Sequence, residues 1–367
     1  MLFLNNEDVM AVLNMPTCIE AMEGAYRDLN EQRAGFRPRI DFYVPQKPHY
    51  YRWGTMEGVS RKLGIFAIRM KSDMLVWNRH AEFQTEDKYC VEPGSYCGLI
   101  FLLSVKNGEP LCLMNDGYLQ HMRVGACAGL GAKYLSRKDS RVLGMLGSGG
   151  MARTYAMAIC EVRPIERIQV FSPTRENCER YAVELRKKLG IEVTVMDSAD
   201  RAVKNSDIVA CATDSLVPVV KGEWLEPGMH VTNVRANEVG PDLLARVDLS
   251  ARLGASTFVV DHPPAEVITG TDGNFSYFAG TPQERELIPV PVSPIRKTDN
   301  AEVGTIPDLI ARRWHGRTSD NQITFLRNSG TQGLQFAAVG GSAYELAKAK
   351  GLGNTIPTEW LLQNIRD

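Results

Sequence analysis

The 367-residue sequence predicts an α/β protein with two domains, one built on a doubly wound parallel sheet and the other of α+β structure. Three observations lead to this prediction. Strand-like and helix-like segments alternate from residue 142 onward, which is typical of a parallel sheet. A glycine-rich turn follows the first of those strands. Between about residues 40 and 115 the apolar runs are instead short and alternating, as in an antiparallel sheet.

The elements can be assigned in chain order. Residues 6–34 place apolar side chains at helical spacing, with Asn6 or Asp8 able to start a helix and Gly35 to follow it. Asn107-Gly108 separates two apolar runs as a tight hairpin turn does. A long helix is expected from residue 118 to about 137. Thereafter we expect strands at 142–146, 166–172, 192–196, 207–213, 229–234 and 257–260, and helices at 175–189 and 199–204.

Composition and charge exclude several classes of protein. The 42 basic and 43 acidic residues nearly cancel, so nothing predicts binding to nucleic acid or to an anionic membrane surface. No stretch approaches the roughly 20 apolar residues that cross a bilayer. The eight cysteines form no Cys-x-x-Cys pair and the N-terminus has no signal-like segment, which together predict a reduced, cytoplasmic protein. The six histidines show no metal-ligand spacing, so we expect no metal.

The turn after the strand at 142–146 reads Gly147-Ser148-Gly149-Gly150-Met151-Ala152 and matches the pattern G-x-G-x-x-A. The first glycine makes the tight turn, the second lets the backbone approach a pyrophosphate, and the small Ala152 allows close packing of helix on strand. The start of the following helix offers N–H groups to phosphate. With a second strand some twenty residues on, the turn predicts a dinucleotide-binding βαβ unit.

The end of that second strand indicates which dinucleotide is bound. Enzymes that use NAD usually place an Asp or Glu there, whereas this chain continues Ser172-Pro173-Thr174-Arg175 without an acid. Hydroxyls and a guanidinium suit a 2′-phosphate, because arginine can donate a charge-assisted pair of hydrogen bonds to it. We therefore predict a preference for NADP(H), with NAD(H) as the second candidate. The alternative is that Arg175 is a solvated side chain at a helix start.

Several ordered segments resemble the ornithine cyclodeaminase and mu-crystallin family. They are RPRID (37–41), NGEPLCLMNDGYLQHMRVGA (107–126), the glycine turn, SDIVACATDSLVPVV (206–220), LEPGMHVTNVRANE (225–238) and GRTSDNQITFLRNSG (316–330). The resemblance implies a dimerisation and substrate domain, formed by residues 1–125 and about 318–367, beside a Rossmann domain at 126–317. It also implies a homodimer or higher homo-oligomer that forms or reduces an imine at the α-carbon of an amino acid.

The resemblance also assigns residues to the substrate. Arg123 stands where the family has an arginine that pairs with the substrate carboxylate, and Arg39 matches a second such arginine, with a surface or interface role as its alternative. The family's lysine, which activates the imine, aligns with Arg69, and Lys71 follows two residues later on the same strand face. Because arginine does not lose its proton at working pH, Arg69 can bind a carboxylate but proton transfer falls to Lys71.

A second departure from the family concerns its acid/base residue. Cyclodeaminases carry an Asp at the position of Asn237, and an amide does not titrate. Glu238 could take over if the loop turned it inward; the alternative is a solvated loop carboxylate. The candidate catalytic residues are Lys71, Arg69, Arg123, Asn237 and Glu238. The residues expected to bind the dinucleotide are Gly147, Ser148, Gly149, Gly150, Met151, Ala152, Ser172, Thr174, Arg175, Thr213, Asn233, Val234, Asn328 and Gly330.

The leading hypothesis is an NAD(P)H-dependent reductase of an α-imino acid, or the reverse reaction as an amino-acid dehydrogenase. Two alternatives stay open: an ornithine-type cyclodeaminase with tightly bound NAD, and a non-catalytic NADPH-binding partner subunit of an amine-oxidising system. Segments 77–98 and 261–299 are longer than is usual in the family. We expect them to pack at an interface or to cap a bulkier substrate. In its length the chain resembles a subgroup of the family that is associated with tyramine oxidation.

Overall fold

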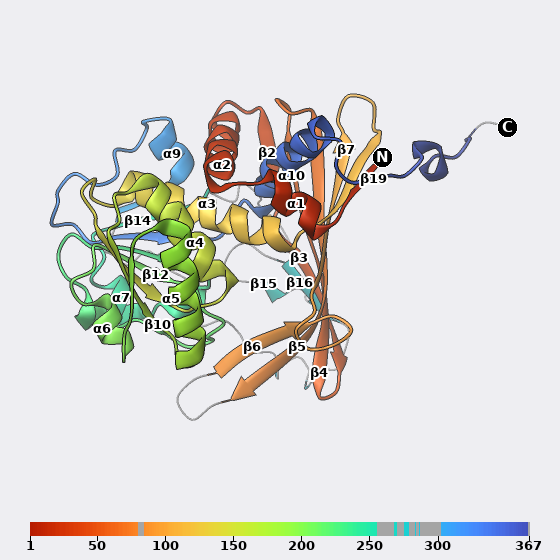
Figure 1. Ribbon diagram of the computed structural model, residues 1–367. Coiled ribbons are helices and arrows are strands. Elements are labelled where there is room, and N and C mark those ends of the chain that lie inside the picture. The colour runs from red at the N-terminus through yellow and green to blue at the C-terminus, as the bar shows by residue number, and fades with distance from the viewer. Residues whose placement is uncertain are drawn as a thin grey trace.

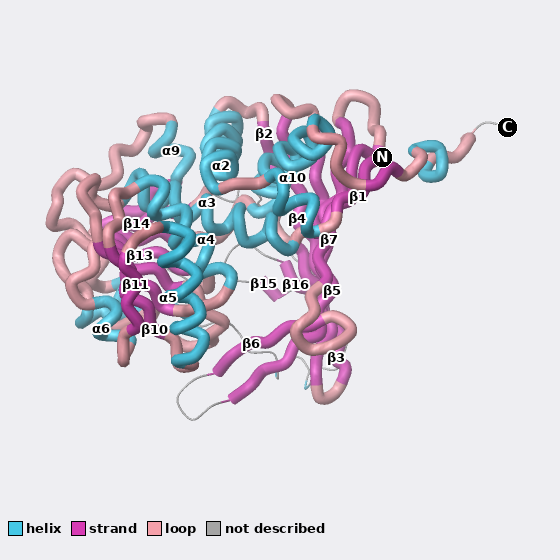
Figure 2. Tube along the Cα trace, in the orientation of Figure 1, coloured by secondary structure: helices cyan, strands magenta, loops and turns pink. Residues whose placement is uncertain are grey.

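Two sheets with their helices make up the molecule in the computed structural model (Figure 1). The structure describes residues 1–79, 84–254, 268–269, 275–278, 283, 286 and 302–365. Helix α3 (Gly117–Leu135) packs against helices of both halves, so it joins the two sheets. Figure 2 shows α2 (Met15–Asn30), α3, α4 (Gly150–Val162) and α10 (Gln332–Ala349) between the two sheets, whereas α6 (Ala199–Val203) lies on the outer side of the parallel strands. In the described part of the chain, no helix is long and apolar enough to cross a membrane.

The first sheet, here called the parallel sheet, has the order β11-β10-β9-β12-β13-β18-β14-β17. Each neighbouring pair runs parallel. The bounds are β9 (Val142–Leu146), β10 (Arg167–Phe171), β11 (Glu192–Val195), β12 (Ile208–Cys211), β13 (His230–Asn233), β14 (Leu249–Arg252), β17 (Glu302–Thr305) and β18 (Thr324–Arg327). The predicted α/β class and parallel sheet are confirmed. The strand expected at 257–260 lies outside the described residues.

Alternate residues of the central strands enter cores on opposite faces of the parallel sheet. In β12, for example, Ile208 and Ala210 belong to one apolar cluster and Val209 and Cys211 to the other. Such a strand is apolar throughout because helices cover both of its faces. The helices and 3-10 turns are α4 (Gly150–Val162), α5 (Arg175–Leu189), α6 (Ala199–Val203), η1 (Gly222–Trp224), η2 (Ala236–Glu238), α7 (Pro241–Leu244) and α9 (Ile306–Ile310).

The second sheet, here called the mixed sheet, has the order β15-β16-β3-β4-β5-β7-β8-β1-β19, with β2 paired to β4 and β6 to β5. Its strands pair antiparallel except at β1–β8 and β16–β3. The bounds are β1 (Leu2–Leu4), β2 (Ala34–Phe36), β3 (Ile40–Gln46), β4 (His49–Ser60), β5 (Ile65–Arg79), β6 (Gln84–Tyr89), β7 (Cys97–Ser104), β8 (Pro110–Asn115), β15 (Ile268–Thr269), β16 (Phe275–Phe278) and β19 (Asn354–Thr355). The expected hairpin is β7–β8, and Gly108 in its connection has φ +78°.

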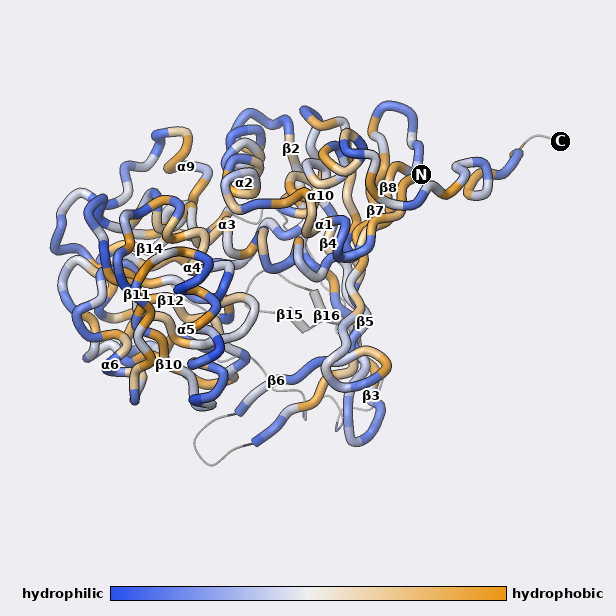
Figure 3. Tube along the Cα trace, viewed as in Figure 1, coloured by the Kyte–Doolittle hydropathy of each residue, from blue (hydrophilic) through white to orange (hydrophobic). Residues whose placement is uncertain are grey.

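Helices α1 (Asn6–Val12), α2 (Met15–Asn30) and α10 (Gln332–Ala349) accompany the mixed sheet, and the 3-10 turn η3 (Thr358–Leu361) follows them. Asn5 caps α1, one residue before the predicted start, and Asp8 completes a capping box with it. Gly35 lies within β2 instead of ending the helix, because Glu31 closes α2 earlier. Figure 3 shows apolar residues along the strands and the helices packed on them.

The domain limits expected from the sequence need two corrections. Strand β18, assigned with residues 318–367 to the dimerisation domain, lies inside the parallel sheet between β13 and β14. Strands β15 and β16, assigned with residues 126–317 to the Rossmann domain, instead extend the mixed sheet at β3. Both errors have one cause. A strand can pair with strands that are distant in the sequence, so a domain boundary drawn at one residue number can assign it to the wrong sheet.

Candidate functional site

The glycine turn between β9 and α4 has the shape that a dinucleotide requires. Gly147 has φ +109°, and a Cβ there would lie 2.3 Å from the carbonyl oxygen of Ala212, so only glycine fits. At Gly149 no heavy atom comes within 4 Å of the Cβ position. No side chain caps the start of α4. The backbone N–H groups of that helix start can therefore meet a pyrophosphate.

The carboxyl end of β10 presents the residues expected to choose between NAD and NADP. Thr174 precedes α5 without capping it, and Arg175 is exposed. Arg175 Nη1 donates to Asp197 Oδ1 at 3.0 Å, and Asp197 also pairs with Arg201 at 3.3 Å. Two guanidinium groups therefore meet at the edge of the dinucleotide region. Arg201 was not predicted from the sequence, because it belongs to a later helix, α6.

The remaining predicted cofactor residues lie at the carboxyl ends of β12, β13 and β18, the edge where such sheets bind ligands. Asn233 Nδ2 donates to the carbonyl of Arg235 at 2.6 Å, and its buried Oδ1 has no partner among the described residues. Asn328 Nδ2 donates to the Tyr155 hydroxyl at 2.6 Å. Gly330 follows with φ +95°. Thr213 and Val234 both donate hydrogen bonds to the carboxylate of Glu238.

Glu238 is fully buried and accepts four hydrogen bonds. Its Oε1 accepts from the amide and hydroxyl of Thr213 at 2.6 and 2.8 Å. Its Oε2 accepts from the amides of Val234 and Arg235 at 2.8 and 2.7 Å. Burial raises the pKa of Glu238, and these hydrogen bonds oppose the rise. The alternative of a solvated loop carboxylate is therefore wrong: the side chain is buried and its hydrogen bonds join the ends of β12 and β13. An acid/base role for Glu238 stays a hypothesis, which these four hydrogen bonds disfavour.

Asn237 is also held by the backbone. Its Nδ2 donates to the carbonyl of Leu216 at 3.0 Å, and the residue is buried. An amide that anchors a neighbouring loop has neither the proton nor the freedom of the Asp expected in a cyclodeaminase.

Arg123, on α3, is a buried cation that hydrogen-bonds to neutral side chains. Its Nη1 donates to Gln335 Oε1 at 2.6 Å and its Nη2 to Gln120 Oε1 at 2.8 Å, while its guanidinium lies 4.8 Å from the centre of the Phe336 ring. No carboxylate pairs with Arg123 in the described ranges. Burial lowers the pKa of Arg123 to about 10, with a further contribution from Arg69. A buried charge without a partner is costly, so the position favours an anionic ligand.

The guanidinium of Arg69, on β5, contacts the same aromatic ring as that of Arg123, and its Cζ lies 5.7 Å from the centre of the Phe336 ring. Its Nε donates to Asp116 Oδ2 at 2.6 Å and its Nη2 to the Tyr96 hydroxyl at 2.5 Å. The other oxygen of Asp116, Oδ1, is buried and has no partner among the described residues. Asp116 and Tyr96 were not predicted from the sequence as site residues.

Lys71 is buried between two carboxylates on the same face of β5 as Arg69. Its Nζ lies 3.4 Å from Asp41 Oδ1 and 3.4 Å from Asp73 Oδ2. Burial and the nearby arginines hold the pKa of Lys71 well below its usual value, and the two carboxylates partly oppose that shift. Gly54, opposite Lys71 on β4, makes room for it, since a Cβ there would lie 2.5 Å from Lys71 Cε.

Arg39 belongs to the same cluster. Its Nε lies 2.8 Å from Asp41, and its side chain is only 20% exposed, so the alternative of a free surface arginine is not what the structure shows. On the other side of Lys71, Arg52 donates to Asp73 Oδ2 at 2.8 Å. The mixed sheet thus places Arg39, Lys71 and Arg52 in one row of alternating charges.

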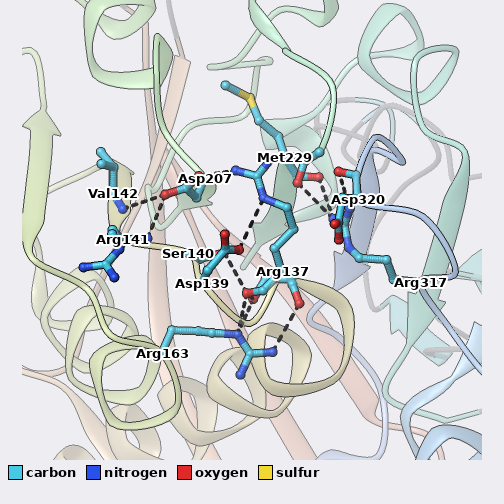
Figure 4. A network of polar contacts seen from close by, with 12 residues as sticks. Arg137, Asp139, Ser140, Arg141, Val142, Arg163, Asp207, Met229, Arg317 and Asp320 are labelled. Atoms are coloured by element: carbon cyan, nitrogen blue, oxygen red, sulfur yellow. Dashed lines mark hydrogen bonds and ion pairs between the residues drawn. The ribbon is translucent and has the colours of Figure 1, made fainter.

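A second polar network lies at the opposite, amino-terminal edge of the parallel sheet (Figure 4). Arg163 Nη2 donates to the carbonyl of Lys133 at 2.6 Å, and Arg317 Nε to that of Leu135 at 2.8 Å. Arg137 pairs with Asp207. Arg163 and Arg317 therefore donate to carbonyl groups at the end of α3, which is a structural role.

The parallel sheet with its glycine turn, set beside a mixed sheet that carries buried charged side chains, defines a dinucleotide-binding protein of the Rossmann class. The chain belongs to the ornithine cyclodeaminase/mu-crystallin family, whose model matches residues 1–339.

Individual relatives extend the comparison. A Δ1-pyrroline-2-carboxylate reductase of Bacillus thuringiensis subsp. konkukian is 27% identical over 259 residues, 71% of this chain and 74% of the relative. An alanine dehydrogenase of Archaeoglobus fulgidus is 26% identical over 356 residues, 97% of this chain and 98% of the relative. Among solved structures, the Δ1-pyrroline-2-carboxylate reductase of Thermococcus litoralis, in complex with NADH and L-proline, matches with a TM-score of 0.75 and 26% identity. The match covers 97% of this chain and 100% of that one.

Proposed function

We propose that the protein is an NAD(P)H-dependent reductase of α-imino acids that also runs in reverse as an amino-acid dehydrogenase. The observation that carries the proposal is Arg123, a buried guanidinium without a carboxylate partner in the part of the chain that the structure describes. A substrate carboxylate supplies the missing charge, ideally as a bidentate pair. The reductase and dehydrogenase relatives act on imino and amino acids of this kind.

Each charged group of the site has a role in this reaction. Arg123 and Arg69, which both contact the Phe336 ring, hold the substrate carboxylate. Arg39 lies next to Lys71, since both side chains contact Asp41. Lys71 donates a proton to the imine nitrogen, because its lowered pKa makes the ammonium a better acid than an ordinary lysine. A nicotinamide cofactor bound at the glycine turn supplies the hydride.

The NADP(H) preference also stays a proposal. Its support is the absence of an acid at residues 172–175 together with the pair of guanidinium groups of Arg175 and Arg201. Asp197 and Glu179 both contact Arg175, so a 2′-phosphate has to share that guanidinium with two carboxylates.

We further propose that the protein forms a homodimer. Phe42 on β3 and Trp53 on β4 are 40% and 39% exposed, so part of the outer side of the mixed sheet presents aromatic surface to solvent. Light scattering at micromolar concentration should show twice the chain mass. A stable 40.8 kDa particle would contradict the dimer.

Ornithine cyclodeamination has less support. Expelling ammonia needs a proton donor, and the two residues at that position, Asn237 and Glu238, are both engaged in loop hydrogen bonds. The alternative of a non-catalytic partner subunit is less favoured because Lys71 is a buried, titratable group beside the carboxylate site.

The test is a substrate panel followed by NADPH and NADH absorbance. It contains Δ1-pyrroline-2-carboxylate, and α-keto acids with ammonia or methylamine. Arg123→Ala should lower kcat/KM by about 100-fold, the loss typical of one partner of a buried ion pair. Arg141→Ala, which alters an exposed arginine of the opposite sheet edge, is the control. Release of ammonia from ornithine without net NADPH consumption would overturn the proposal in favour of cyclodeamination.

A further inference from the structure

Strand β6 pairs with both halves of the molecule. One edge pairs antiparallel with β5 of the mixed sheet. The other edge meets the loop that follows β12. There the amide of Leu216 donates to the carbonyl of Gln84 at 2.7 Å, and the amide of Glu86 donates to the carbonyl of Asp214 at 3.3 Å. Figure 1 shows β6 reaching from the mixed sheet toward the parallel sheet. This strand belongs to the long segment 77–98, to which the proposed function gives no role.

Glu86, in the middle of β6, connects the charged groups of the two halves. Its Oε1 accepts from Arg235 Nη2 at 3.2 Å and lies 3.7 Å from Arg52 Nη1. Its Oε2 accepts from Trp77 Nε1 at 3.2 Å, and its side chain is 13% exposed. Burial by itself would raise the pKa of Glu86, but the neighbouring cations, Arg52 above all, hold that pKa well below its usual value. Lys88 Nζ, on the same strand, also lies 3.5 Å from Oε1. Glu86 is therefore a nearly buried anion beside one ammonium group and between the guanidinium groups of the two halves.

Both arginines contact residues of the proposed site. Arg52 pairs with Asp73, which contacts Lys71. Arg235 follows β13, and its amide is bound by Glu238, which also holds Thr213 at the end of β12. Contacts therefore run without a gap from the lysine of the mixed sheet to the loops of the parallel sheet where the dinucleotide is expected.

We propose that Glu86 is a positioning residue for hydride transfer: it joins Arg52 to Arg235 and so fixes the imino-acid side of the site relative to the dinucleotide side. This inference rests on the proposed function. Reaction requires the two reacting atoms at close to van der Waals contact, and a misplacement of about 1 Å can cost about 100-fold in rate. Without the carboxylate, the buried guanidinium of Arg52 and the partly buried guanidinium of Arg235 would repel each other across this junction.

The first test does not depend on turnover. Glu86→Gln keeps the length of the side chain and one acceptor oxygen but removes the charge. Hydrogen exchange of the backbone amides of Leu216 and of residue 86 should become about 10-fold faster than in the wild type, because the junction opens more often. Amides of β9 and β10 should not change. Glu166→Gln, at an exposed ion pair with Arg141, is the matched control. Unchanged exchange at the junction would overturn the inference.

The second test is kinetic. With the imino acid that the wild type reduces, Glu86→Gln should lower kcat by about 10- to 100-fold while KM changes by less than about 3-fold. The isotope effect with deuterated NADPH should rise, since hydride transfer becomes slower than the other steps. Glu86→Gln combined with Arg235→Gln should cost little more than either alone, as expected for a coupled pair.

The outcomes separate the two proposals. A wild type that reduces no imino acid contradicts the proposed function, and hydrogen exchange then decides on the junction by itself. An active wild type in which Glu86→Gln raises KM with kcat unchanged overturns the inference, because Glu86 would then contribute to binding and not to positioning.

Discussion

Glu238→Ala should destabilise the protein, because the buried Glu238 carboxylate is the acceptor for a set of partly buried donors. The carboxylate accepts from the amides of Thr213, Val234 and Arg235 and from the Thr213 hydroxyl. Of these, the Val234 amide has a second acceptor in the carbonyl of Cys211 at 3.1 Å. The hydroxyl can rotate toward another partner. The amides of Thr213 and Arg235 are therefore the groups that lose their acceptor.

The magnitude follows from those two amides. A fully buried donor left without a partner costs about 1–3 kcal/mol, and these two donors are partly buried, so the alanine variant should lose about 2–4 kcal/mol of unfolding free energy. At about 2.1 cal/mol/K of unfolding entropy per residue, the Tm of a 367-residue chain changes by about 1–1.5 °C per kcal/mol, so a loss of about 3 kcal/mol lowers Tm by roughly 4 °C. Glu238→Gln keeps one oxygen for one pair of donors and turns its amide toward the other pair. We expect about half the loss of the alanine variant.

Thermal unfolding followed by circular dichroism measures this loss. Glu166→Gln serves as the control, because an exposed ion pair contributes only about 0–1 kcal/mol. At temperatures where Glu238→Gln is folded, imino-acid reduction should persist. A Tm within about 2 °C of the wild type, combined with loss of activity, would refute the reasoning. That result would make Glu238 a catalytic group and return cyclodeamination to consideration.

Three further predictions follow from the charged groups. Arg175→Ala should weaken NADPH binding by about 10-fold while leaving NADH binding nearly unchanged, as measured by nucleotide titration; an equal loss for both would remove the basis for the NADP(H) preference. If Lys71 is the proton donor, kcat/KM should fall as pH rises through its pKa, which lies below 10.5, and Lys71→Arg should remove that decline from the pH profile; a wild-type profile flat up to pH 10.5 would contradict this role. Burial, together with Arg317 and Arg163, lowers the pKa of His230 to about 3. The folded state thus binds a proton less readily than the unfolded chain, so the stability due to His230 is complete above pH 6.5 and should fall by about 2 kcal/mol between pH 6.5 and 5. In urea unfolding, the free energy of unfolding of His230→Gln should not show this fall between pH 6.5 and 5. If the wild type and the variant have the same pH dependence, His230 is not a neutral imidazole in the folded core.

Local sequence was enough to predict the parts of the protein that neighbouring residues determine. Strands β9 to β13 and helices α4 and α5 are visible in the apolar pattern. The glycine turn is also a local feature, because the positive φ of Gly147 belongs to a single short segment. Resemblance to the family then added Arg123 and Arg69, which the fold places on one aromatic ring.

Tertiary structure alone decided which partners those residues have. Arg69 finds Asp116 at a distance of 47 positions along the chain, and Arg123 finds Gln335 at 212 positions. Glu238 looked like a loop carboxylate because its donors come from two different strand ends. Likewise, β18 enters the parallel sheet between β13 and β14, far from either in sequence. A buried charge takes its partner from whatever the folded chain brings within hydrogen-bond distance, and that choice is made by long-range packing, which leaves no periodicity in the sequence.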